Sequence, residues 1–171
     1  VSEERLVDEV WGPDEVPANP AKALQVVVSR ARSQTAPDVV VRADHGYRLV
    51  HLDAAAWTTP ADFHRDIRTA LDFPDHYGDN LDAFDDCLRD VAMYAYGADR
   101  DATGTVLVFT RYDAFARHEP RAAQAILDII AGTARFAMLY GHRMLCLVQS
   151  DDPDLAFEPV GATPVTRQDF R

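Results

Sequence analysis

The chain has 171 residues, of which 47% are apolar and 26% charged, the composition of a globular domain with an ordinary core. Its formal net charge is −11 at pH 7, and residues 47–171 carry 12 Lys and Arg against 20 Asp and Glu. This part of the chain lacks the clustered cations that nucleic-acid phosphates require, so its charge favours a cationic partner.

Membrane insertion and secretion are not expected. The apolar runs are far shorter than the roughly 18 residues of a membrane span, and the N-terminal sequence "VSEERLVDE" is acidic where a signal peptide is basic and then apolar. We therefore expect a cytoplasmic protein. Cys87 and Cys146 each lie in an apolar pattern, so we expect small buried side chains and no disulfide framework or zinc site.

Residues 1–46 form a first section with its own pattern. Apolar residues at helical spacing predict a helix over residues 3–11, which "GPDEVP" ends. A second helix is predicted from Asn19 as N-cap and Pro20 as first helical residue to about residue 34. The sequence "DVVVRADHGYRLV" then predicts a hairpin around a Gly-containing turn.

From residue 47 onward, apolar strand patterns alternate with helical ones. Strands are predicted at residues 47–53, 104–112 and 143–150, and helices at 59–71 with Thr59 as cap, at 79 to about 95, and at 119–139. Strands separated by helices indicate parallel pairing with right-handed crossovers, so residues 47–150 are predicted to be one α/β domain. Residues 151–171 contain three prolines and little periodicity, which predicts a surface extension with room for one short strand.

The stretch "FPDHYGDNLDAFDDCLRD", residues 73–90, carries six aspartates and one cation, Arg89. At helical spacing, Leu81, Phe84, Leu88 and Val91 share one stripe, and Asp79, Asp82, Asp86 and Asp90 lie roughly opposite. Each i,i+4 pair of like charges costs about 0.2–0.5 kcal/mol, so the acidic face is mildly destabilising. It is either a plain solvated face or a binding surface.

The motif "FPDHYGDNLDAFDDCL" resembles the barstar-like ribonuclease inhibitors, whose hallmark is "YG", an Asn, "LDAL" and "DCL". The resemblance covers about residues 47–150. It implies a small three-stranded parallel sheet packed with helices and an inhibitor that plugs the active-site cleft of a secreted or toxin-type cationic ribonuclease. Asp82 and Asp86 would stand in for substrate phosphates. The implied partner-binding residues are His76, Tyr77, Gly78, Asn80, Asp82, Asp85 and Asp86.

The chain departs from this family pattern at several positions. Asp85 and His76 stand where the family often has aromatic residues, Gly132 stands near a further acidic position, and Arg89 brings a cation into the acidic helix. We therefore expect a target different from the best-known enzyme of the family. Binding also has a physical basis that is separate from the resemblance: carboxylates about 5–6 Å apart on one helix face form a preorganised anion that steers a cationic cleft.

Residues 1–46 resemble a second family, the response-regulator type winged-helix domain, in two helices and a wing. That resemblance implies that Lys22, Gln25, Ser29, Arg30 and Arg32 would face DNA. However, the supporting sheet and first helix of such domains are missing, and the section holds 5 Lys and Arg against 8 Asp and Glu. We therefore favour a packing extension or an interaction arm over DNA binding.

No other constellation in the sequence points to chemistry. The six histidines lack metal-ligand spacing, so we expect them in loops and on the surface, with His76 placed to contact a partner or respond to pH. Asp79, Asp82 and Asp86 on one rigid helix would not wrap a cation. We expect no catalytic residues, metal or cofactor. The leading function is ribonuclease inhibition, the alternative is a transcriptional regulator, and a ribonuclease ranks third because its charge would repel RNA.

Overall fold

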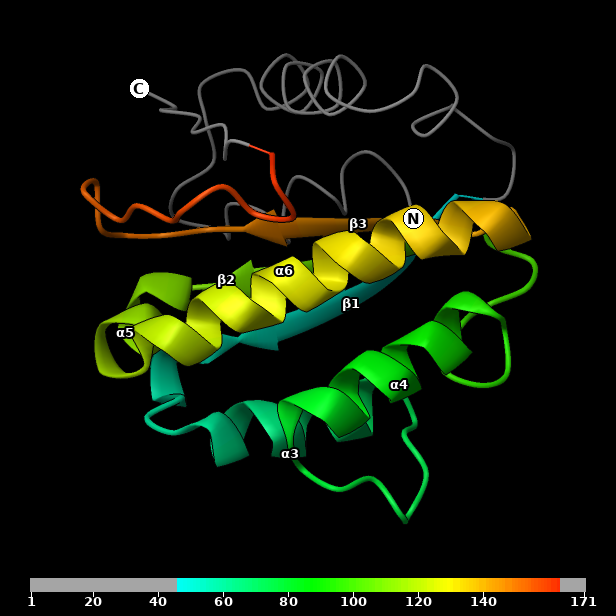
Figure 1. Cartoon of the computed structure of the whole chain (residues 1–171), viewed down its shortest axis with the longest axis horizontal. Coiled ribbons are helices and arrows are strands. Elements are labelled where there is room, and N and C mark those ends of the chain that lie inside the picture. The colour runs from blue at the N-terminus through cyan, green and yellow to red at the C-terminus, as the bar shows by residue number, and fades with distance from the viewer. Residues whose placement is uncertain (1–45, 164–171) are drawn as a thin grey trace.

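The computed structural model describes residues 46–163, which form a three-stranded parallel sheet in the order β1-β2-β3 (Figure 1). The strands are β1 (Arg48–Asp53), β2 (Gly104–Thr110) and β3 (Arg143–Val148). The predicted α/β fold with a small parallel sheet is thus confirmed. The predicted winged-helix section and its candidate DNA-facing residues lie outside the described residues, as do residues 164–171.

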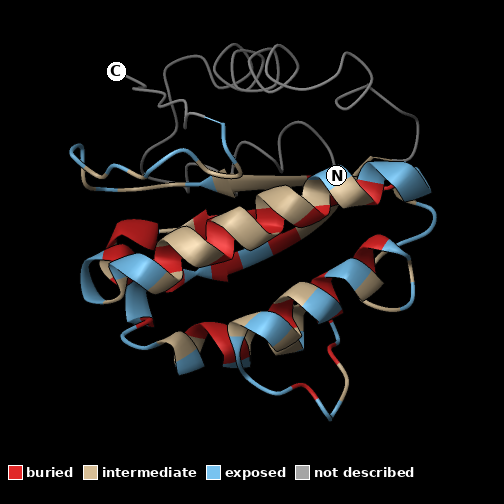
Figure 2. Cartoon of the chain, viewed as in Figure 1, coloured by how far each residue is buried: buried red, intermediate tan, exposed pale blue. Residues whose placement is uncertain are grey.

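All helices predicted for residues 47–150 are present, and the structure adds one further α-helix, at Tyr112–His118. The helices are α3 (Pro60–Ala70), α4 (Leu81–Ala92), α5 (Tyr112–His118) and α6 (Pro120–Ala137), with short 3-10 helices at Ala54–Ala56 (η1) and Met138–Tyr140 (η2). Because strand order follows chain order, right-handed crossovers place both helical connections on the same face of the sheet. The buried residues in Figure 2 accordingly gather on the strands and on the sides of the helices that face them.

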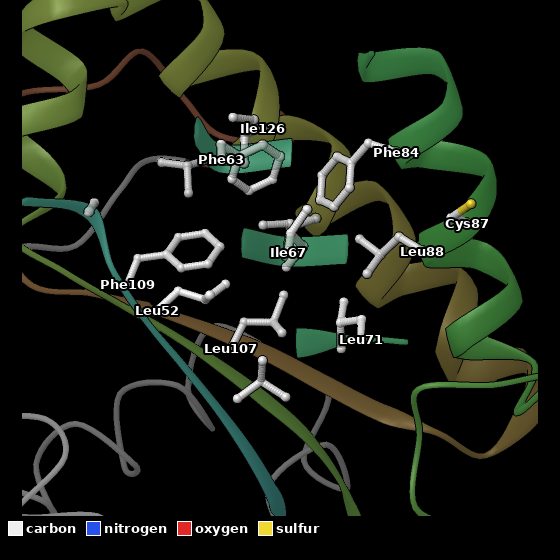
Figure 3. Packing of buried hydrophobic residues seen from close by; sticks show 14 of the residues in the cluster. Leu52, Phe63, Ile67, Leu71, Phe84, Cys87, Leu88, Leu107, Phe109 and Ile126 are labelled. Atoms are coloured by element: carbon white, nitrogen blue, oxygen red, sulfur yellow. The ribbon is translucent and has the colours of Figure 1, made fainter. Parts of the chain in front are cut away.

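The core lies between that face and the helices. Val50 and Leu52 of β1 pair in register with Leu107 and Phe109 of β2, and all four side chains are buried. Figure 3 shows the strand residues opposite apolar side chains from three helices: Phe63 and Ile67 of α3, Phe84 and Leu88 of α4, and Ile126 of α6. This packing fixes which side of each helix faces solvent.

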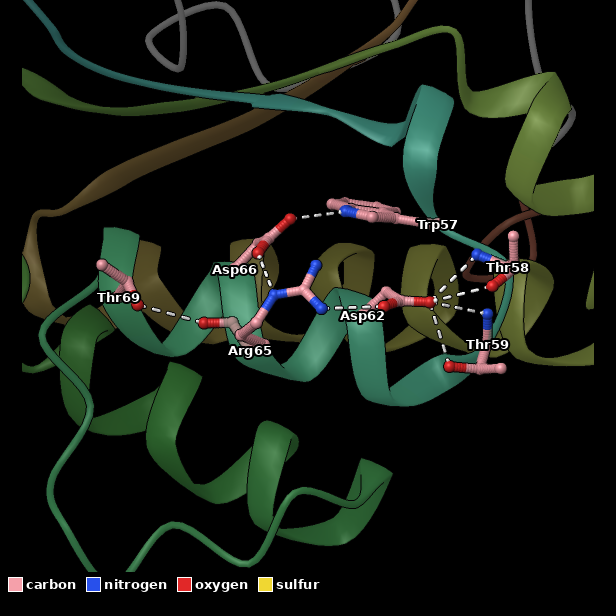
Figure 4. Close-up of polar contacts among 7 residues, drawn as sticks. All are labelled: Trp57, Thr58, Thr59, Asp62, Arg65, Asp66 and Thr69. Carbon is pink, nitrogen blue, oxygen red and sulfur yellow. Dashed lines mark hydrogen bonds and ion pairs between the residues drawn. The ribbon is translucent and has the colours of Figure 1, made fainter.

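The start of α3 is set by one carboxylate. The predicted cap Thr59 occupies the N-cap position, and the Asp62 carboxylate accepts hydrogen bonds of 3.0 Å from both its backbone N–H and its hydroxyl (Figure 4). Arg65 pairs with Asp62 at 2.8 Å, and the Trp57 indole N–H donates to Asp66 at 2.8 Å. The Arg65 guanidinium and the donors at the helix start hold the pKa of Asp62 well below its usual range.

The predicted strand over 104–112 is two residues too long. β2 ends at Thr110, Arg111 adopts a left-handed conformation with φ 51°, and α5 begins at Tyr112. Arg111 also forms an ion pair with Asp53 at the end of β1. In the sequence, Tyr112 extends the apolar pattern of β2. The left-handed Arg111 instead starts a helix that packs Tyr112 and Phe115 against the core.

Two histidines are buried, so the prediction of loop and surface histidines is wrong for His64 and His142. The His142 ring hydrogen-bonds the Thr105 hydroxyl at 2.9 Å and the Ala92 carbonyl at 3.3 Å, and it stacks on Tyr94 at a centroid distance of 4.5 Å. An imidazole whose two nitrogens are both satisfied is tolerated in a core. Sequence spacing carries no sign of these long-range partners.

Both cysteines are free thiols, and the sequence pattern indicates no disulfide framework. Cys87 is buried on α4. Cys146 on β3 is only half-buried as a residue, so the expected burial is confirmed for Cys87 but not for Cys146. Burial of the thiol itself raises the pKa of Cys146 to about 12.

Helix α6 is the main apolar helix of the domain. The segment Pro120–Tyr140 is long and apolar enough, by length and composition alone, to cross a membrane. Its buried side chains, among them Ile126 and Ile130, belong to the core cluster. The core helix of a folded domain can be equally long and apolar. The packing of α6 in the core therefore explains its apolar composition.

The segment after β3 is more than a surface extension. Leu155, Phe157 and Val160 pack against the core, and Gly161 donates its N–H to the Asp128 carboxylate at 2.7 Å. An isolated antiparallel bridge between Val160 and Thr163 takes the place of the optional extra strand. The proline-rich sequence conceals this packing because three isolated apolar residues form no periodic pattern.

Two glycines are predicted to respond to alanine in opposite directions. Gly132 lies inside α6, and a Cβ added there would meet nothing within 4 Å, so Gly132→Ala is expected to raise the free energy of unfolding by about 0.5–1 kcal/mol. At Gly104 a Cβ would overlap the Arg143 carbonyl oxygen, so Gly104→Ala is expected to destabilise. Urea unfolding of both variants measures the two effects. Stabilisation by Gly104→Ala, or destabilisation by Gly132→Ala, would contradict this packing.

Candidate partner-binding site

Helix α4 begins at an Asn cap. The Asn80 side-chain oxygen accepts the Ala83 N–H at 2.9 Å, and Asp79 just before it is left-handed with φ 47°. The predicted start at residue 79 is therefore two residues early. The helix ends at Ala92, before the predicted end near residue 95, because Tyr94 is left-handed with φ 62°.

Helix α4 divides into an apolar face and an acidic one. Its buried residues are Phe84, Cys87, Leu88, Val91 and Ala92, which include most of the predicted apolar stripe. Asp82 and Asp86 are exposed, one helical turn apart, on the other side. We call these two residues the acidic pair. Neither side chain forms a hydrogen bond or an ion pair within residues 46–163, although the charge of Asp86 acts on Arg89 nearby.

The other two aspartates of the helix are engaged. Asp85 forms an ion pair with Arg89 at 3.1 Å and lies 3.5 Å from the Thr133 hydroxyl of α6. Asp90, which the helical pattern placed on the acidic face, accepts a hydrogen bond of 3.2 Å from the Tyr96 hydroxyl. These two carboxylates therefore serve the packing of α4 rather than its open face.

Arg89 contacts side chains beside α6, although the charge of Asp86 also acts on it. Besides its ion pair with Asp85, its guanidinium lies 5.3 Å from the centroid of the Phe136 ring. The neighbouring Asp85 carboxylate holds the pKa of Arg89 above its usual value. The cation that seemed out of place in the acidic sequence is thus paired beside α6.

The loop before α4, residues 72–80, is fixed by two aromatic side chains that point into the core. Phe73 and Tyr77 are buried with ring centroids 4.9 Å apart, and the Tyr77 hydroxyl hydrogen-bonds the His64 ring of α3. Burial raises the pKa of Tyr77 well above its usual value. His76 and Gly78, on either side of Tyr77, are exposed.

A close approach explains the glycine of this loop. A Cβ at Gly78 would lie 2.9 Å from the Asn80 side-chain nitrogen, which itself donates to the Gly78 carbonyl at 3.0 Å. Gly78 and the Asn80 cap therefore form one local unit that sets how the loop enters α4. A substitution at Gly78 would displace the cap.

The seven predicted site residues thus adjoin one another but differ in what they expose. His76, Gly78, Asp82 and Asp86 are exposed, Tyr77 places its ring in the core, Asn80 uses its side chain as the cap, and Asp85 is paired. Sequence reasoning missed His64, which holds Tyr77, and Thr133, beside Asp85. Both are long-range contacts for which the sequence contains no spacing signal.

The geometry supports binding at an open acidic face. Within residues 46–163 there is no group of three or more His, Cys, Asp or Glu placed to hold a metal ion. Two fixed and unpaired carboxylates can accept charge-assisted hydrogen bonds from Arg or Lys side chains of another molecule. The site can therefore act as a preorganised anion.

Comparison with models of known protein families gives a match to this part of the chain. The family model described as Barstar (barnase inhibitor) matches residues 47–149, more than half of the chain. The match begins at the residue before β1 and ends directly after β3, so it covers the sheet, the four helices and the acidic pair. None of the curated proteins compared with the chain matches it.

We predict that the domain loses stability as pH falls below about 6.5, the reference pKa of histidine. Burial lowers the pKa of His64, against a weaker attraction from Asp79, and burial also lowers that of His142. The unfolded chain therefore binds these protons at higher pH than the folded chain does, and the stability contributed by neutral imidazoles is present above that pH and lost below it.

Urea midpoints at pH 7.5 and pH 5 measure this effect. We expect a lower midpoint at pH 5, and His64→Gln is expected to reduce the difference between the two midpoints because it removes one of the two titrating groups. A midpoint that is equal or higher at pH 5 would contradict the assignment of both histidines as buried and neutral.

Proposed function

Because the chain belongs to the barstar family of barnase inhibitors, we propose that this protein is an intracellular inhibitor of a cationic ribonuclease. The acidic pair enters the cleft of the enzyme in place of two substrate phosphates. The exposed His76 and Gly78 of the adjoining loop contact the rim of that cleft. The inhibitor itself performs no chemistry.

The observation that carries the proposal is that Asp82 and Asp86 are exposed and form no ion pair within residues 46–163. Some other aspartates of the domain form ion pairs with an arginine: Asp62 and Asp66 with Arg65, and Asp85 with Arg89. The acidic pair keeps a like-charge repulsion at i,i+4 spacing that no ion pair within residues 46–163 relieves, although the charge of Arg89 acts on Asp86. A partner that supplies two cations explains why this repulsion is kept.

Charge also suits the rate of association. The 12 Lys and Arg against 20 Asp and Glu in residues 47–171 create a negative field that attracts a basic enzyme. The Asn80 cap and the buried Tyr77 already order the loop before the enzyme binds, so little conformational entropy of the loop is lost on binding. Steering and preorganisation favour fast and tight binding together.

The pairing of Asp85 with Arg89 bears on the choice of target. Where relatives often present an aromatic side chain, this chain presents a largely neutralised ion pair beside the acidic pair. We propose that the target enzyme contacts this position through polar groups rather than through an apolar or aromatic surface. No observation on residues 46–163 favours the alternative of DNA binding.

Asp86→Ala is predicted to separate binding from stability. In the free protein it removes repulsion with Asp82 and Asp90, so stability stays equal or rises by about 0.2–0.5 kcal/mol for each pair relieved. In the complex it removes one partner of a buried charge pair, which costs about 2–5 kcal/mol in complexes of this family. Binding to the target ribonuclease should weaken at least about thirtyfold.

Calorimetric titration and thermal unfolding measure the two effects. The matched control is Asp154→Ala, which removes the same charge from an exposed position in the tail and should leave both unchanged. Asp85→Ala is expected to weaken binding less than Asp86→Ala does, because its carboxylate is already paired. Unchanged binding in Asp86→Ala, or unfolding of that variant, would contradict a binding role for the acidic pair.

Association is predicted to depend on salt. Raising the ionic strength from about 0.05 to about 0.5 M shortens the Debye length to about a third, so association should slow by more than dissociation speeds up. Stopped-flow measurements over this range provide the test. An association rate that does not change with salt would rule out electrostatic steering. It would not rule out contact at the acidic pair, which the calorimetric titration tests separately.

A further inference from the structure

The sheet has a second apolar face. Side chains alternate along each strand, so the residues that do not face the helices point to the other side. In register across the sheet these are Leu49 with Val106 and Leu145, and Val108 with Leu147. The valines of the central strand are buried and the leucines of the edge strands half-buried. We call these five residues the outer sheet face.

No crossover helix covers the outer sheet face. The strand order follows the chain order, and the helices between strands pack on the opposite face. The core cluster contains Leu107 and Phe109 of β2 but neither of the valines beside them. Parallel sheets are almost always covered on both faces, because exposing either one leaves a large apolar surface in water. Something outside residues 46–163 must therefore fit here.

Residues 1–45 of the same chain are a candidate to cover the outer sheet face. Residues 1–45 join the domain at Gly46, whose carbonyl accepts the Thr103 N–H at 2.7 Å beside the start of β2. Strand β1 begins two residues after Gly46, and its second residue, Leu49, belongs to the outer sheet face. The preceding segment therefore enters at the edge of this face.

The sequence of that segment has the matching chemistry. Leu6, Val7, Val10 and Trp11 recur at helical spacing, and Val26, Val27 and Val28 lie in the second predicted helix. In helices these residues would form apolar stripes, which need an apolar surface to pack against. A sheet of three such strands is about 20 Å long, and a helix of about 15 residues spans about 22 Å, so the lengths agree.

We propose that residues 1–45 dock on the outer sheet face and form the second apolar layer of this domain. Two apolar surfaces of one chain, joined at Gly46, thereby cover each other. The docked segment lies on the side of the sheet away from α4, so it leaves the acidic pair open. This proposal does not depend on the ribonuclease proposal, and either one can fail alone.

Cysteine accessibility in the full chain tests the docking. Val108→Cys places a thiol in the centre of the outer sheet face, and Ala95→Cys provides an exposed reference on the helical side. The parent chain gives the background from Cys87 and Cys146. We expect maleimide to label Val108→Cys at least about a hundredfold more slowly than Ala95→Cys, with mass spectrometry identifying the modified residue.

The role of the N-terminal segment is tested by adding Leu6→Asp, Val10→Asp and Val27→Asp to Val108→Cys. We expect labelling to accelerate at least about tenfold while the near-ultraviolet circular dichroism of the buried Trp57 is unchanged. The matched control adds Ser2→Asp, Ser29→Asp and Ser33→Asp, which bring the same charge to polar positions and should leave the rate unchanged.

Three results would overturn the proposal. One is labelling of Val108→Cys within about tenfold of Ala95→Cys, which would mean a bare face. Another is protection that survives the three apolar-to-aspartate changes, which would mean a cover other than this segment. The third is protection that disappears on dilution together with a change in molecular mass, which would identify a second copy of the chain as the occupant.

Discussion

The packing of Phe84 and Leu88 of α4 into the core is the contact on which the rest of the site depends. Both side chains are fully buried in the core cluster, where the Phe84 ring meets Phe63 of α3 at a centroid distance of 5.0 Å and α4 packs along α6. Because they fix the rotation of the helix about its axis, Asp82 and Asp86 must face outward. The energy of apolar burial, about 1.5–3 kcal/mol for each large side chain, easily exceeds the few tenths that each like-charge pair costs. A locally unfavourable charge pattern can therefore be held rigidly in place.

The loop before the helix is held in the same way. Phe73 and Tyr77 anchor it from inside, while His76 and Gly78 remain outside. The hydrogen bond between Tyr77 and His64 connects this loop to α3, so a surface formed by one short stretch of sequence depends on a distant helix. Rigidity of this kind lowers the entropy lost on binding.

Much of this could be predicted from the sequence. The buried β2, the Thr59 cap and the apolar stripe of α4 are local patterns, and the structure confirms each of them. The errors arose where the deciding contact is distant or conformational. Arg111 turns left-handed, ends β2 and starts α5, a helix that was not predicted, and His142 finds its partners on β2 and at the end of α4. The pairing of Arg89 with Asp85 fits an i,i+4 spacing, but its approach to Phe136 of α6 could not be predicted.

Contact between the acidic pair and a basic ribonuclease can be observed directly. The decisive measurement is a crystal structure of the full chain in complex with a basic ribonuclease. The ribonuclease to use is the one that co-purifies with the chain from the cells that produce the chain. Both carboxylates, of Asp82 and Asp86, are expected within about 4 Å of Arg, Lys or His side chains in the active-site cleft of the enzyme. A complex formed through another face of the domain, with Asp82 and Asp86 left in solvent, would contradict the proposed inhibition mechanism.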